Sequence, residues 1–377
     1  MIVLDEPYVS EPLIAWLEES QHPVLDNAFA RSIADGRALN LVSSDEAVRR
    51  IDAGERVYTN SENALAWIVE SAHNESLSRA IGLFKDKAAM RAALAGLDPD
   101  LFFKSCSVDE LFKLDFSQLP APFVLKPSVG FCSMGVYAIQ NREDWERALA
   151  DIQQNASSWH DMYPESVIGA GSFILEGYLE GTEYALDAYF DETGRAHILN
   201  VLRHDFTSPE DTSDRMYVTS ASIVRDTSTM FASWLDRVNA LIGARNFPVH
   251  VEVRVSDGHV SPIEFNPLRF AGLGGTDVSW YGYGYRTYQA FLEDDEPDFD
   301  AAFERQDRQG VLHVAAERAG RCLGRRRLRL RRVPRSILPR VGDAPLRREA
   351  RGQLRLPVLG DGSVHVRRAG FPHALRS

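Results

Sequence analysis

The chain has 377 residues, of which 44% are hydrophobic and 25% are charged, and its net charge is −12. This composition excludes a disordered or fibrous chain, and the length favours two to three domains. We expect no membrane segment, since no apolar run nears the roughly 18 residues that a membrane helix needs. Acidic residues directly after Met1–Leu4 argue against a signal peptide. The cysteines form no metal or disulfide pattern, which predicts a reducing, cytoplasmic environment. They are Cys106, Cys132 and Cys322.

The N-terminal segment, residues 1–84, alternates short apolar runs with a helical pattern, which is typical of an α/β domain. We expect strands at 2–4, 40–42 and 57–58. From 61 to 74, apolar side chains recur every three to four residues, and this spacing predicts one face of a helix. That face consists of Leu65, Ile68, Val69 and Ala72.

Two further regions follow the first domain. Asp86 is expected to cap a helix that runs to Leu94 and stops at Gly96. The second region begins near Phe103, and it should contain a strand at 123–126, a Gly/Ser loop at 127–135, a return strand at 136–139 and a helix starting at Asn141 and Asp144. The third region holds the long strands, which we expect at 173–179, 184–190 and 197–202, then a helix ending at Gly243 and a hairpin of 249–255 and 260–265.

This last hairpin carries polar side chains at every second position. Side chains alternate along a strand, so these positions share one face on each strand. Two carboxylates on one face repel each other unless a cation lies between them, and carboxylate and amide oxygens suit Mg²⁺. Glu252, Glu264 and Asn266 are therefore candidate metal ligands, with a solvated strand face as the alternative. His250 and Arg254 share the face of Glu252.

The length of the hairpin loop decides whether the two carboxylates lie on the same side. A three-residue loop at 256–258 would pair His250 with Glu264 and bring the carboxylates onto one face. A two-residue turn at 257–258, which Asp-Gly favours, would place them on opposite faces. We expect the three-residue loop, because the whole set of motifs is more specific than one dipeptide.

Two other segments are candidates for nucleotide binding. The loop after Lys126 contains Gly130 and Gly135, which allow backbone N–H groups to point at an anion, and the lysine supplies charge for phosphate. It lacks the Lys-Ser/Thr ending of a Walker A loop, and an ordinary turn is the alternative. Further on, backbone groups near Glu176 could contact the edge of an adenine and Glu183 could hold a ribose, with a polar linker as the alternative.

In this order, the motifs resemble the ATP-grasp superfamily of carboxylate–amine and carboxylate–thiol ligases. The resemblance covers residues 1 to about 290. It implies an ATP-grasp fold: a Rossmann-like α/β domain at 1–84 precedes an α+β ATP-grasp domain at 85–290. The latter would grip ATP between a lid subdomain, about 105–180, and a metal-binding subdomain, about 181–290. The motifs are Lys87 after Asp86, the loop after Lys126, the Glu176 to Glu183 turn, Glu252, and Glu264 with Asn266 and Pro267.

The resemblance implies ATP and Mg²⁺ as cofactors and gives each motif a role. Lys87 and Lys126 would contact the ATP phosphates under a mobile lid formed by 127–135. Glu176 would accept a hydrogen bond from the adenine amino group, and Glu183 would bind the ribose. The metal would be held by Glu252, Glu264 and Asn266. The implied nucleotide-binding set is Lys87, Lys126, Ser128, Gly130, Ser133, Gly135, Glu176, Gly177, Tyr178, Leu179, Glu183 and Arg203.

One position departs from the family pattern. Many relatives carry an arginine two residues after the asparagine, where it faces the acyl phosphate, whereas this chain has Leu268 there and Arg269 next. We expect Arg269, together with Arg254 on the polar strand face, to act as catalytic cations. Arg203 and His204 are candidates for phosphate contacts, with a surface arginine and a core histidine as the alternatives.

The implied reaction is an ADP-forming ligation of a small carboxylate and an amine. A carboxylate oxygen would attack the γ-phosphate in line, and the amine would displace phosphate from the acyl phosphate. A closed lid would exclude water. Neither Cys106 nor Cys132 should be essential, because no protein nucleophile is required. The alternatives are an ATP-grasp enzyme with another acceptor, as in a carboxylase or kinase-like reaction, and a nucleotide-binding protein without turnover. The sequence leaves a homo-oligomer open.

The C-terminal tail, residues 305–377, differs in composition from the rest. It carries 19 basic and 5 acidic residues, whereas residues 1–304 carry 23 and 49. The acidic body argues against nucleic-acid binding by the main fold. All basic residues of the tail are arginines, and it offers two readings: a frameshifted reading of a GC-rich gene, which we favour, or a basic arm that binds nucleic acid.

Overall fold

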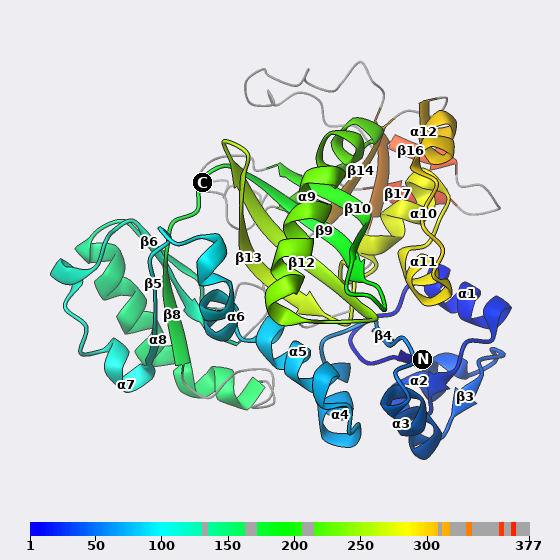
Figure 1. The fold of residues 1–377 in the computed structure, drawn as a ribbon, viewed down its shortest axis with the longest axis horizontal. Helices are drawn as coiled ribbons and strands as arrows, with labels where there is room; N and C mark the ends of the chain where they lie inside the picture. The colour runs from blue at the N-terminus through cyan, green and yellow to red at the C-terminus, as the bar shows by residue number, and fades with distance from the viewer. Residues whose placement is uncertain are drawn as a thin grey trace, which may run out of the picture.

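Three large β-sheets, each built from a separate stretch of chain, form the framework of the molecule (Figure 1). Gly130, Cys132 and Ser133 of the expected lid lie outside the described residues, as do Cys322 and most of the Arg-rich tail. No helix in the described part of the chain is long and apolar enough to cross a membrane. The computed structural model describes residues 1–129, 135–162, 172–205, 215–307, 311–316, 329–333, 354–357 and 363–366.

The first sheet is parallel, as the alternating sequence pattern predicts. It consists of β1 (Ile2–Val3), β2 (Val24–Leu25), β3 (Leu41–Val42) and β4 (Tyr58–Thr59) in the order β3-β2-β1-β4, joined by α1 (Glu11–Ser20), α2 (Ala28–Ala34) and α3 (Ser44–Asp52). Ser10, Asn27 and Ser43 cap these helices, because each side chain accepts a hydrogen bond from the backbone N–H three residues on. The helical pattern at 61–74 corresponds to α4 (Ala64–Ser71).

Two helices meet at Asp86 and place Lys87 at the start of the second one. They are α5 (Glu75–Lys85) and α6 (Lys87–Leu94), followed by the 3₁₀ turn η1 (Ala95–Leu97). The Asp86 carboxylate accepts hydrogen bonds of 2.8 and 3.1 Å from two backbone N–H groups in the first turn of α6, which confirms the predicted cap. Phe84 near the end of α5 stacks on Phe265 of the largest sheet with ring centroids 4.7 Å apart, so this junction is held against that sheet.

The second sheet is antiparallel and packs against one long helix. Its strands are β5 (Phe103–Ser107), β6 (Phe123–Pro127), β7 (Tyr137–Ile139) and β8 (Ser172–Gly177), in the order β5-β8-β6-β7, with α7 (Val108–Leu111), η2 (Phe116–Gln118) and α8 (Arg142–Met162). Asn141 accepts a 3.0 Å hydrogen bond from the N–H of Asp144 and starts α8 as predicted. Trp145 and Ile152 of α8 are buried in one cluster with Phe123 of β6.

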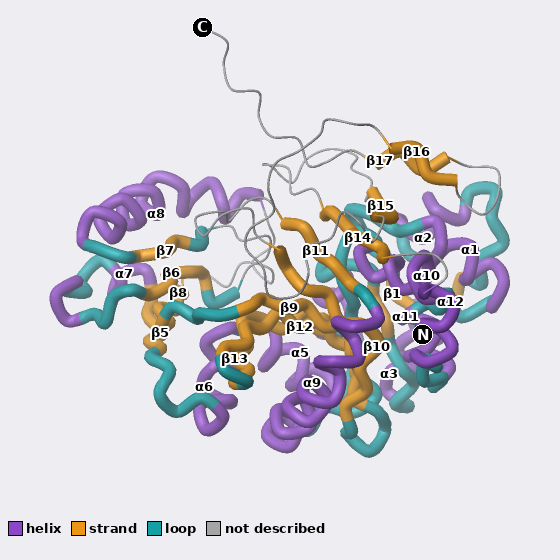
Figure 2. The backbone as a smooth tube through the Cα atoms, turned by 90° about the horizontal axis from the view of Figure 1, so that it is seen from above, coloured by secondary structure: helices purple, strands orange, loops and turns teal. Residues whose placement is uncertain are grey.

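The third and largest sheet has one apolar and one polar face. On the apolar face, α9 (Ala221–Ile242) lies across the strands (Figure 1), and Figure 2 shows α5 and α9 on the same side of the sheet. Phe231, Trp234 and Leu235 of α9 are buried there, and Gly243 ends the helix with φ 76°, as predicted. The strand order is β13-β12-β9-β10-β11-β14-β15. The bounds are β9 (Thr182–Phe190), β10 (Ala196–Asp205), β11 (Arg215–Thr219), β12 (Phe247–Ser256), β13 (His259–Pro267), β14 (Val311–Ala316) and β15 (Arg329–Val333).

The remaining elements follow β13 in the chain, and some of them belong to the tail. They are η3 (Gly275–Asp277), α10 (Val278–Tyr283), α11 (Thr287–Glu293), α12 (Phe299–Asp307) and a ribbon of β16 (Leu354–Pro357) and β17 (Ser363–Val366). The tail strand β15 pairs antiparallel with β14 at the sheet edge. Whether the tail is a frameshifted reading stays a prediction.

The β12–β13 connection differs from the predicted one. It is a two-residue turn of Asp257 (φ 50°) and Gly258 (φ 78°), and Ser256 pairs with His259. Positive φ at both central residues is the requirement of a tight hairpin turn that Asp-Gly meets well. The three-residue loop expected from the motif set is therefore wrong.

A β-bulge in β13 nevertheless restores the shared face. On one side of the bulge Val253 pairs with Pro262, and on the other side Glu252 pairs with Glu264, so Ile263 is the extra residue. The one-residue shift reverses the parity that the short turn imposes. Glu252 and Glu264 stand directly opposite each other, which confirms that they share a face.

Asp277 is a buried carboxyl group at the contact between the first domain and the segment after β13. It is 4% exposed and accepts hydrogen bonds from the hydroxyl groups of Ser10 and Tyr288, the latter at 3.4 Å. Burial raises the pKa of Asp277 to about 6, although these two hydroxyls and the charge of Arg286 act in the opposite direction. The folded chain therefore holds a proton here that the unfolded chain releases near pH 4.

We predict that Asp277→Asn weakens the pH dependence of stability. A carboxyl group whose pKa is raised by folding binds more protons in the folded state, so the free energy of unfolding falls as pH rises from about 4 to about 6. A shift of about two units corresponds to about 3 kcal/mol, and asparagine mimics the protonated form without titrating. Urea denaturation at about pH 4.5 and about pH 7 should show the wild type losing stability relative to the variant. Equal pH dependence in both proteins would contradict the assignment.

Candidate active site

A set of charges lies on the polar face of the largest sheet, at the β12–β13 hairpin. Glu252 is 8% exposed, and Glu264 stands opposite it. The ammonium group of Lys87 lies 3.1 Å from Oε2 of Glu264. Burial alone would lower the pKa of Lys87, but Glu264, Glu62 and Glu252 outweigh burial and hold this pKa above its usual value. Lys87 therefore stays charged beside the carboxylates.

Arg269 supplies a second cation to this cluster. Its Nη2 donates hydrogen bonds to Oδ1 of Asn266 at 2.7 Å and to Oε1 of Glu62 at 2.6 Å. Burial opposes the charge of the guanidinium, yet Glu62, Glu264 and Glu252 raise the pKa of Arg269. The predicted catalytic arginine and the predicted metal ligands thus lie together.

A second buried cluster ties α6 to both neighbouring sheets. Oε2 of Glu176 accepts hydrogen bonds of 3.1 and 2.8 Å from Nε and Nη2 of Arg91, and Oε1 forms an ion pair with Lys126. The exposed fractions of Arg91, Glu176 and Lys126 are 2%, 3% and 4%. Arg91 also donates to the carbonyl of Pro262 at 2.6 Å, and Lys126 donates to the carbonyl of Ile263 at 3.3 Å. The bulge that sets the parity of β13 therefore also supplies carbonyls to these two cations.

This arrangement gives Glu176 a structural role, because its carboxylate binds two buried cations. Burial raises the pKa of Glu176, but Lys126 and Arg91 outweigh burial and hold the pKa below its usual value. Both carboxylate oxygens bind cations, and the adenine contact implied by the resemblance stays a prediction. Glu176 also holds Lys126, whose pKa is lowered mainly by burial. The phosphate contact of Lys126 stays a prediction.

A third cluster surrounds Glu183 at the start of β9. Oε1 of Glu183 lies 2.7 Å from Nδ1 of His204, and Oε2 accepts a 2.9 Å hydrogen bond from Nη2 of Arg254. The strand register explains this, because His204 on β10 and Arg254 on β12 both stand opposite Glu183. Arg254 also lies 6.0 Å from the ring centroid of Tyr178, whose side chain is exposed. The ribose contact of Glu183 and the catalytic role of Arg254 stay predictions.

The turn between β8 and β9 holds three of the predicted nucleotide-binding residues. Gly177 ends β8, and Tyr178 and Leu179 follow it. Gly181 has φ 103°, and a Cβ atom there would lie 2.2 Å from the carbonyl oxygen of Val255. Only glycine fits so close to β12, and this close approach fixes the turn beside the polar face.

Arg203 does not belong to the polar face. The register pairs Arg203 with Tyr184, whereas the next residue, His204, pairs with Glu183. Tyr184 packs on Phe231 of α9, so Arg203 lies on the apolar side of the sheet, away from the carboxylates. The expected phosphate contact of Arg203 is therefore wrong, because adjacent residues of a strand point to opposite faces.

Two predicted nucleotide-binding residues lie near the ends of the expected lid. Ser128 is 1% exposed, and its carbonyl accepts a 2.8 Å hydrogen bond from the N–H of Lys87. Its Oγ is buried and has no hydrogen-bond partner within the described ranges. A buried hydroxyl of this kind fits an additional polar ligand such as a phosphate oxygen. Gly135 has φ 64°, a conformation that favours glycine.

The oxygen donors at the hairpin fit a magnesium ion. Glu252 and Glu264 stand opposite each other, and Asn266 lies two residues along the same strand face. Mg²⁺ prefers such hard oxygen ligands. The part of the chain that the structure describes contains no group of three or more His, Cys, Asp or Glu side chains that could hold a metal, so the fit depends on this mixed set. Lys87 and Arg269 balance these oxygens in the structure.

Asp187 anchors the segment that carries Arg269, and the sequence analysis assigned no role to this residue. It is fully buried on β9. Its Oδ1 accepts a 2.8 Å hydrogen bond from the N–H of Ala271 and lies 2.7 Å from Nδ1 of His250, while Oδ2 accepts from the hydroxyl of Thr276 at 2.8 Å. The segment after β13 is thus attached to β9 at two points.

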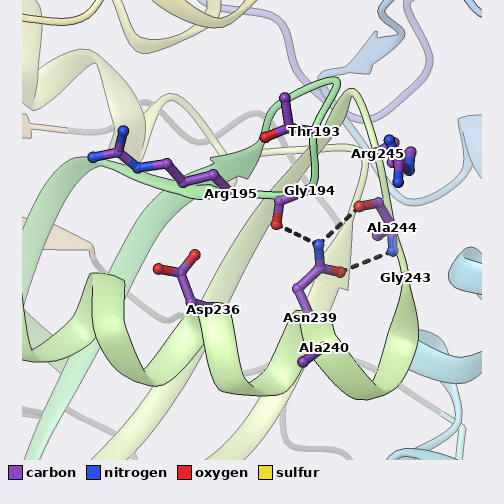
Figure 3. A pocket seen from close by; sticks show the side chains of 9 residues that line it. All are labelled: Thr193, Gly194, Arg195, Asp236, Asn239, Ala240, Gly243, Ala244 and Arg245. Carbon is purple, nitrogen blue, oxygen red and sulfur yellow. Dashed lines mark hydrogen bonds between the residues drawn. The ribbon is translucent and has the colours of Figure 1, made fainter.

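A hollow of about 400 Å³ shares no lining residue with these clusters (Figure 3). It opens between the β9–β10 turn and the end of α9. The Asn239 amide donates to the carbonyls of Gly194 and Ala244 at 2.7 and 2.8 Å and accepts from the N–H of Ala244 at 2.8 Å. These hydrogen bonds join α9 to the turn, so the residues that line the hollow serve to hold these two elements together.

Comparison with known proteins identifies the domain that holds most residues of the charged clusters. Residues 119–277 match the family model of the ATP-grasp domain. The fold is similar to an L-amino acid ligase from Bacillus licheniformis, with 19% identity, a TM-score of 0.57, and coverage of 78% of this chain and 74% of that chain. It is also similar to a biotin carboxylase from Campylobacter jejuni, with 13% identity, a TM-score of 0.55, and coverage of 80% of this chain and 72% of that chain. An N5-carboxyaminoimidazole synthase from Aspergillus clavatus is similar too, with 16% identity, a TM-score of 0.52, and coverage of 84% of this chain and 81% of that chain. No curated protein matches the chain.

The chain therefore carries an ATP-grasp domain and has an ATP-grasp fold, which confirms the resemblance drawn from its motifs. Three residues of the charged clusters were missed by sequence reasoning: Arg91, Glu62 and Asp187. Arg91 follows Lys87 by four residues, so a shared helix face could have revealed it. Glu62 gave no local signal, because its partner Arg269 is 207 residues away.

We predict that Arg91→Met destabilises the fold by about 3–5 kcal/mol, because the variant leaves a buried carboxylate and a buried carbonyl without their main donor. Urea denaturation measures the loss. Arg31→Met is the matched control, since Arg31 forms an exposed ion pair with Asp26 at 2.6 Å and should leave stability nearly unchanged. Similar losses in both variants would contradict a special role for the buried cluster.

Proposed function

We propose that the protein is an ADP-forming, ATP-dependent ligase that activates a small carboxylate as an acyl phosphate and transfers it to an amine. The observation that carries this proposal is the pairing of Glu252 with Glu264, with Lys87 on the second carboxylate and Arg269 on the neighbouring Asn266. Phosphoryl transfer depends on positioning and on balanced charge at the phosphates, which a group of this kind can supply. The similarity to an L-amino acid ligase supports an amine as the acceptor.

The nucleotide would lie between the second sheet and the polar face of the third. Lys87 and Lys126 would neutralise phosphate charge, and Glu176 with Arg91 would hold Lys126 in place. Mg²⁺ bound by Glu252, Glu264 and Asn266 would supply further positive charge at the phosphates. Lys87 is suited to this work because its raised pKa keeps it protonated at neutral pH.

Two transfers would complete the reaction. In the first, a carboxylate oxygen of the small acid attacks the γ-phosphorus, the bond to the β,γ-bridging oxygen breaks, and ADP leaves. In the second, the amine nitrogen attacks the acyl carbon, the carbon–oxygen bond to phosphate breaks, and the nitrogen loses a proton. Arg269 would stabilise the negative charge of the acyl phosphate, since its guanidinium is always protonated.

The test is a screen of amino-acid pairs for phosphate release that depends on ATP, with products identified by mass. A condensed product together with one ADP per bond would support the ligase. Phosphate release with a single acid or with bicarbonate alone would favour a carboxylase or kinase-like acceptor. Binding of ATP without release under any condition would favour a nucleotide-binding protein without turnover.

We predict that Glu264→Gln lowers ATP turnover by more than about a hundredfold while the fold stays intact. The variant removes one negative charge from the proposed metal ligands, and a misplaced electrostatic partner of this kind costs about 2.7–4 kcal/mol in the transition state. Circular dichroism checks folding, and steady-state phosphate release at saturating Mg²⁺ checks activity. Glu293→Gln on the exposed side of α11 is the control and should keep full activity. A Glu264→Gln variant as active as wild type would remove the basis of the metal assignment.

A further inference from the structure

The first domain contributes one carboxylate to the charged cluster of the ATP-grasp domain. Glu62 lies in the turn between β4 and α4, and its side chain is 11% exposed. Its Oε1 accepts the 2.6 Å hydrogen bond from Arg269. No motif of the ATP-grasp domain includes Glu62, and the proposed reaction does not use it directly.

The backbone around Arg269 is also shaped by the first domain. Thr59 at the end of β4 donates to the carbonyl of Leu268 through both its N–H, at 2.7 Å, and its hydroxyl, at 3.2 Å. Leu268 has φ 57°, a left-handed conformation that leucine disfavours and that needs support from its surroundings. The strand end and the Glu62 carboxylate therefore fix both the backbone before Arg269 and its guanidinium.

Glu62 acts on three cations of the cluster. It favours the charged forms of Arg269 and Lys87, whose pKa values are raised, and of Lys85, whose pKa is lowered because burial outweighs this effect. Charge-assisted hydrogen bonds are about twice as strong as neutral ones. Glu62 can therefore define the position of a long, flexible arginine side chain.

The hydrogen bonds of Arg269 leave part of its guanidinium available. Arginine has five N–H donors. Glu62 and Asn266 take those of Nη2, and the Phe270 carbonyl takes one from Nη1 at 3.0 Å. Within the described ranges, the Nε donor and the second Nη1 donor have no hydrogen-bond partner. These two donors lie at different edges of the guanidinium plane, so each is available to a separate oxygen of a phosphate or carboxylate.

We infer that Glu62 is the positioning residue that orients Arg269 toward the acyl phosphate, so that the first domain takes part in the chemistry of the ATP-grasp site. This inference rests on the proposed ligase function. Because Glu62 acts through Arg269, which is proposed to face the acyl phosphate, its loss should affect the transfer step and spare the binding of MgATP. A residue that only stabilised the fold would not separate these two quantities.

The experiment compares Glu62→Gln with wild type in steady-state kinetics. Glutamine keeps a hydrogen-bond acceptor and removes the charge. We expect kcat to fall at least about tenfold while KM for MgATP stays within about threefold, the pattern of a group that acts in the transition state. In the double variant Glu62→Gln/Arg269→Ala, the loss should equal that of Arg269→Ala alone. Unchanged kcat in Glu62→Gln, or additive losses in the double variant, would overturn the inference.

A matched control lies at the same contact between domains. Arg56 of the first domain pairs with Asp294 at 2.6 Å, far in sequence from the candidate ligands. Asp294→Asn removes an ion pair between the two parts of the chain, and kcat should stay within about twofold of wild type. An equal fall in kcat for Asp294→Asn and Glu62→Gln would show that only domain contact is involved, and would overturn the positioning role.

A second measurement does not depend on turnover. Phenylglyoxal modifies free arginine side chains, and peptide mass spectrometry follows its reaction with Arg269. We expect Arg269 to react several-fold faster in Glu62→Gln than in wild type, because the ion pair no longer holds it. If wild type released no phosphate with any acceptor, the ligase proposal alone would fail, and faster modification would still support the positioning role. Equal reaction rates would count against that role.

Discussion

Two carboxylates that face each other across a β-ladder set the constraint on which the rest of this site depends. Glu252 and Glu264 are brought together by the register, and without nearby cations their repulsion would oppose the fold. The chain answers with Lys87 from the start of α6 and with Arg269, which lies against Asn266. The neighbouring carboxylates raise the pKa of Lys87 and of Arg269 against the effect of burial, so the negative charges of the cluster are balanced by these two cations. When a metal ion and the phosphates of ATP bind, they would replace ion pairs that the protein already forms between its own side chains.

Elements far apart in the sequence must converge for this balance to exist. The Asp86 cap starts α6 at Lys87, the bulge in β13 turns Glu264 inward, and Asp187 holds the segment that carries Arg269. The bulge has a second effect, because its carbonyls accept hydrogen bonds from Arg91 and Lys126. The bulge thus sets the parity of the hairpin, and Pro262 and Ile263 connect it to α6 and the second sheet. Local geometry and charge placement are therefore a single problem in this fold.

Much of this could be predicted from the sequence, and the failures have physical reasons. The Asp86 cap and the α9 face follow from local rules of capping and periodicity, whereas the shared face of the carboxylates was predicted from the motif set. The hairpin was predicted with the wrong loop, because Asp-Gly does form the tight turn. A bulge next to Pro262, a residue that is typical of bulges and edge strands, corrects the parity. Arg91, the partner of Glu176, was missed because it belongs to a distant helix. Arg203 was expected to contact a phosphate because the register of its strand could not be read from the sequence.

The acyl phosphate is the central claim of this account, and isotope transfer tests it most directly. An acceptor acid labelled with ¹⁸O in its carboxylate, incubated with ATP, Mg²⁺ and an amine, passes one labelled oxygen to phosphate if the acid is phosphorylated before the amine attacks. We predict labelled inorganic phosphate in step with product formation, as measured by mass spectrometry. Product that forms while the released phosphate stays unlabelled would contradict activation of the carboxylate by phosphoryl transfer.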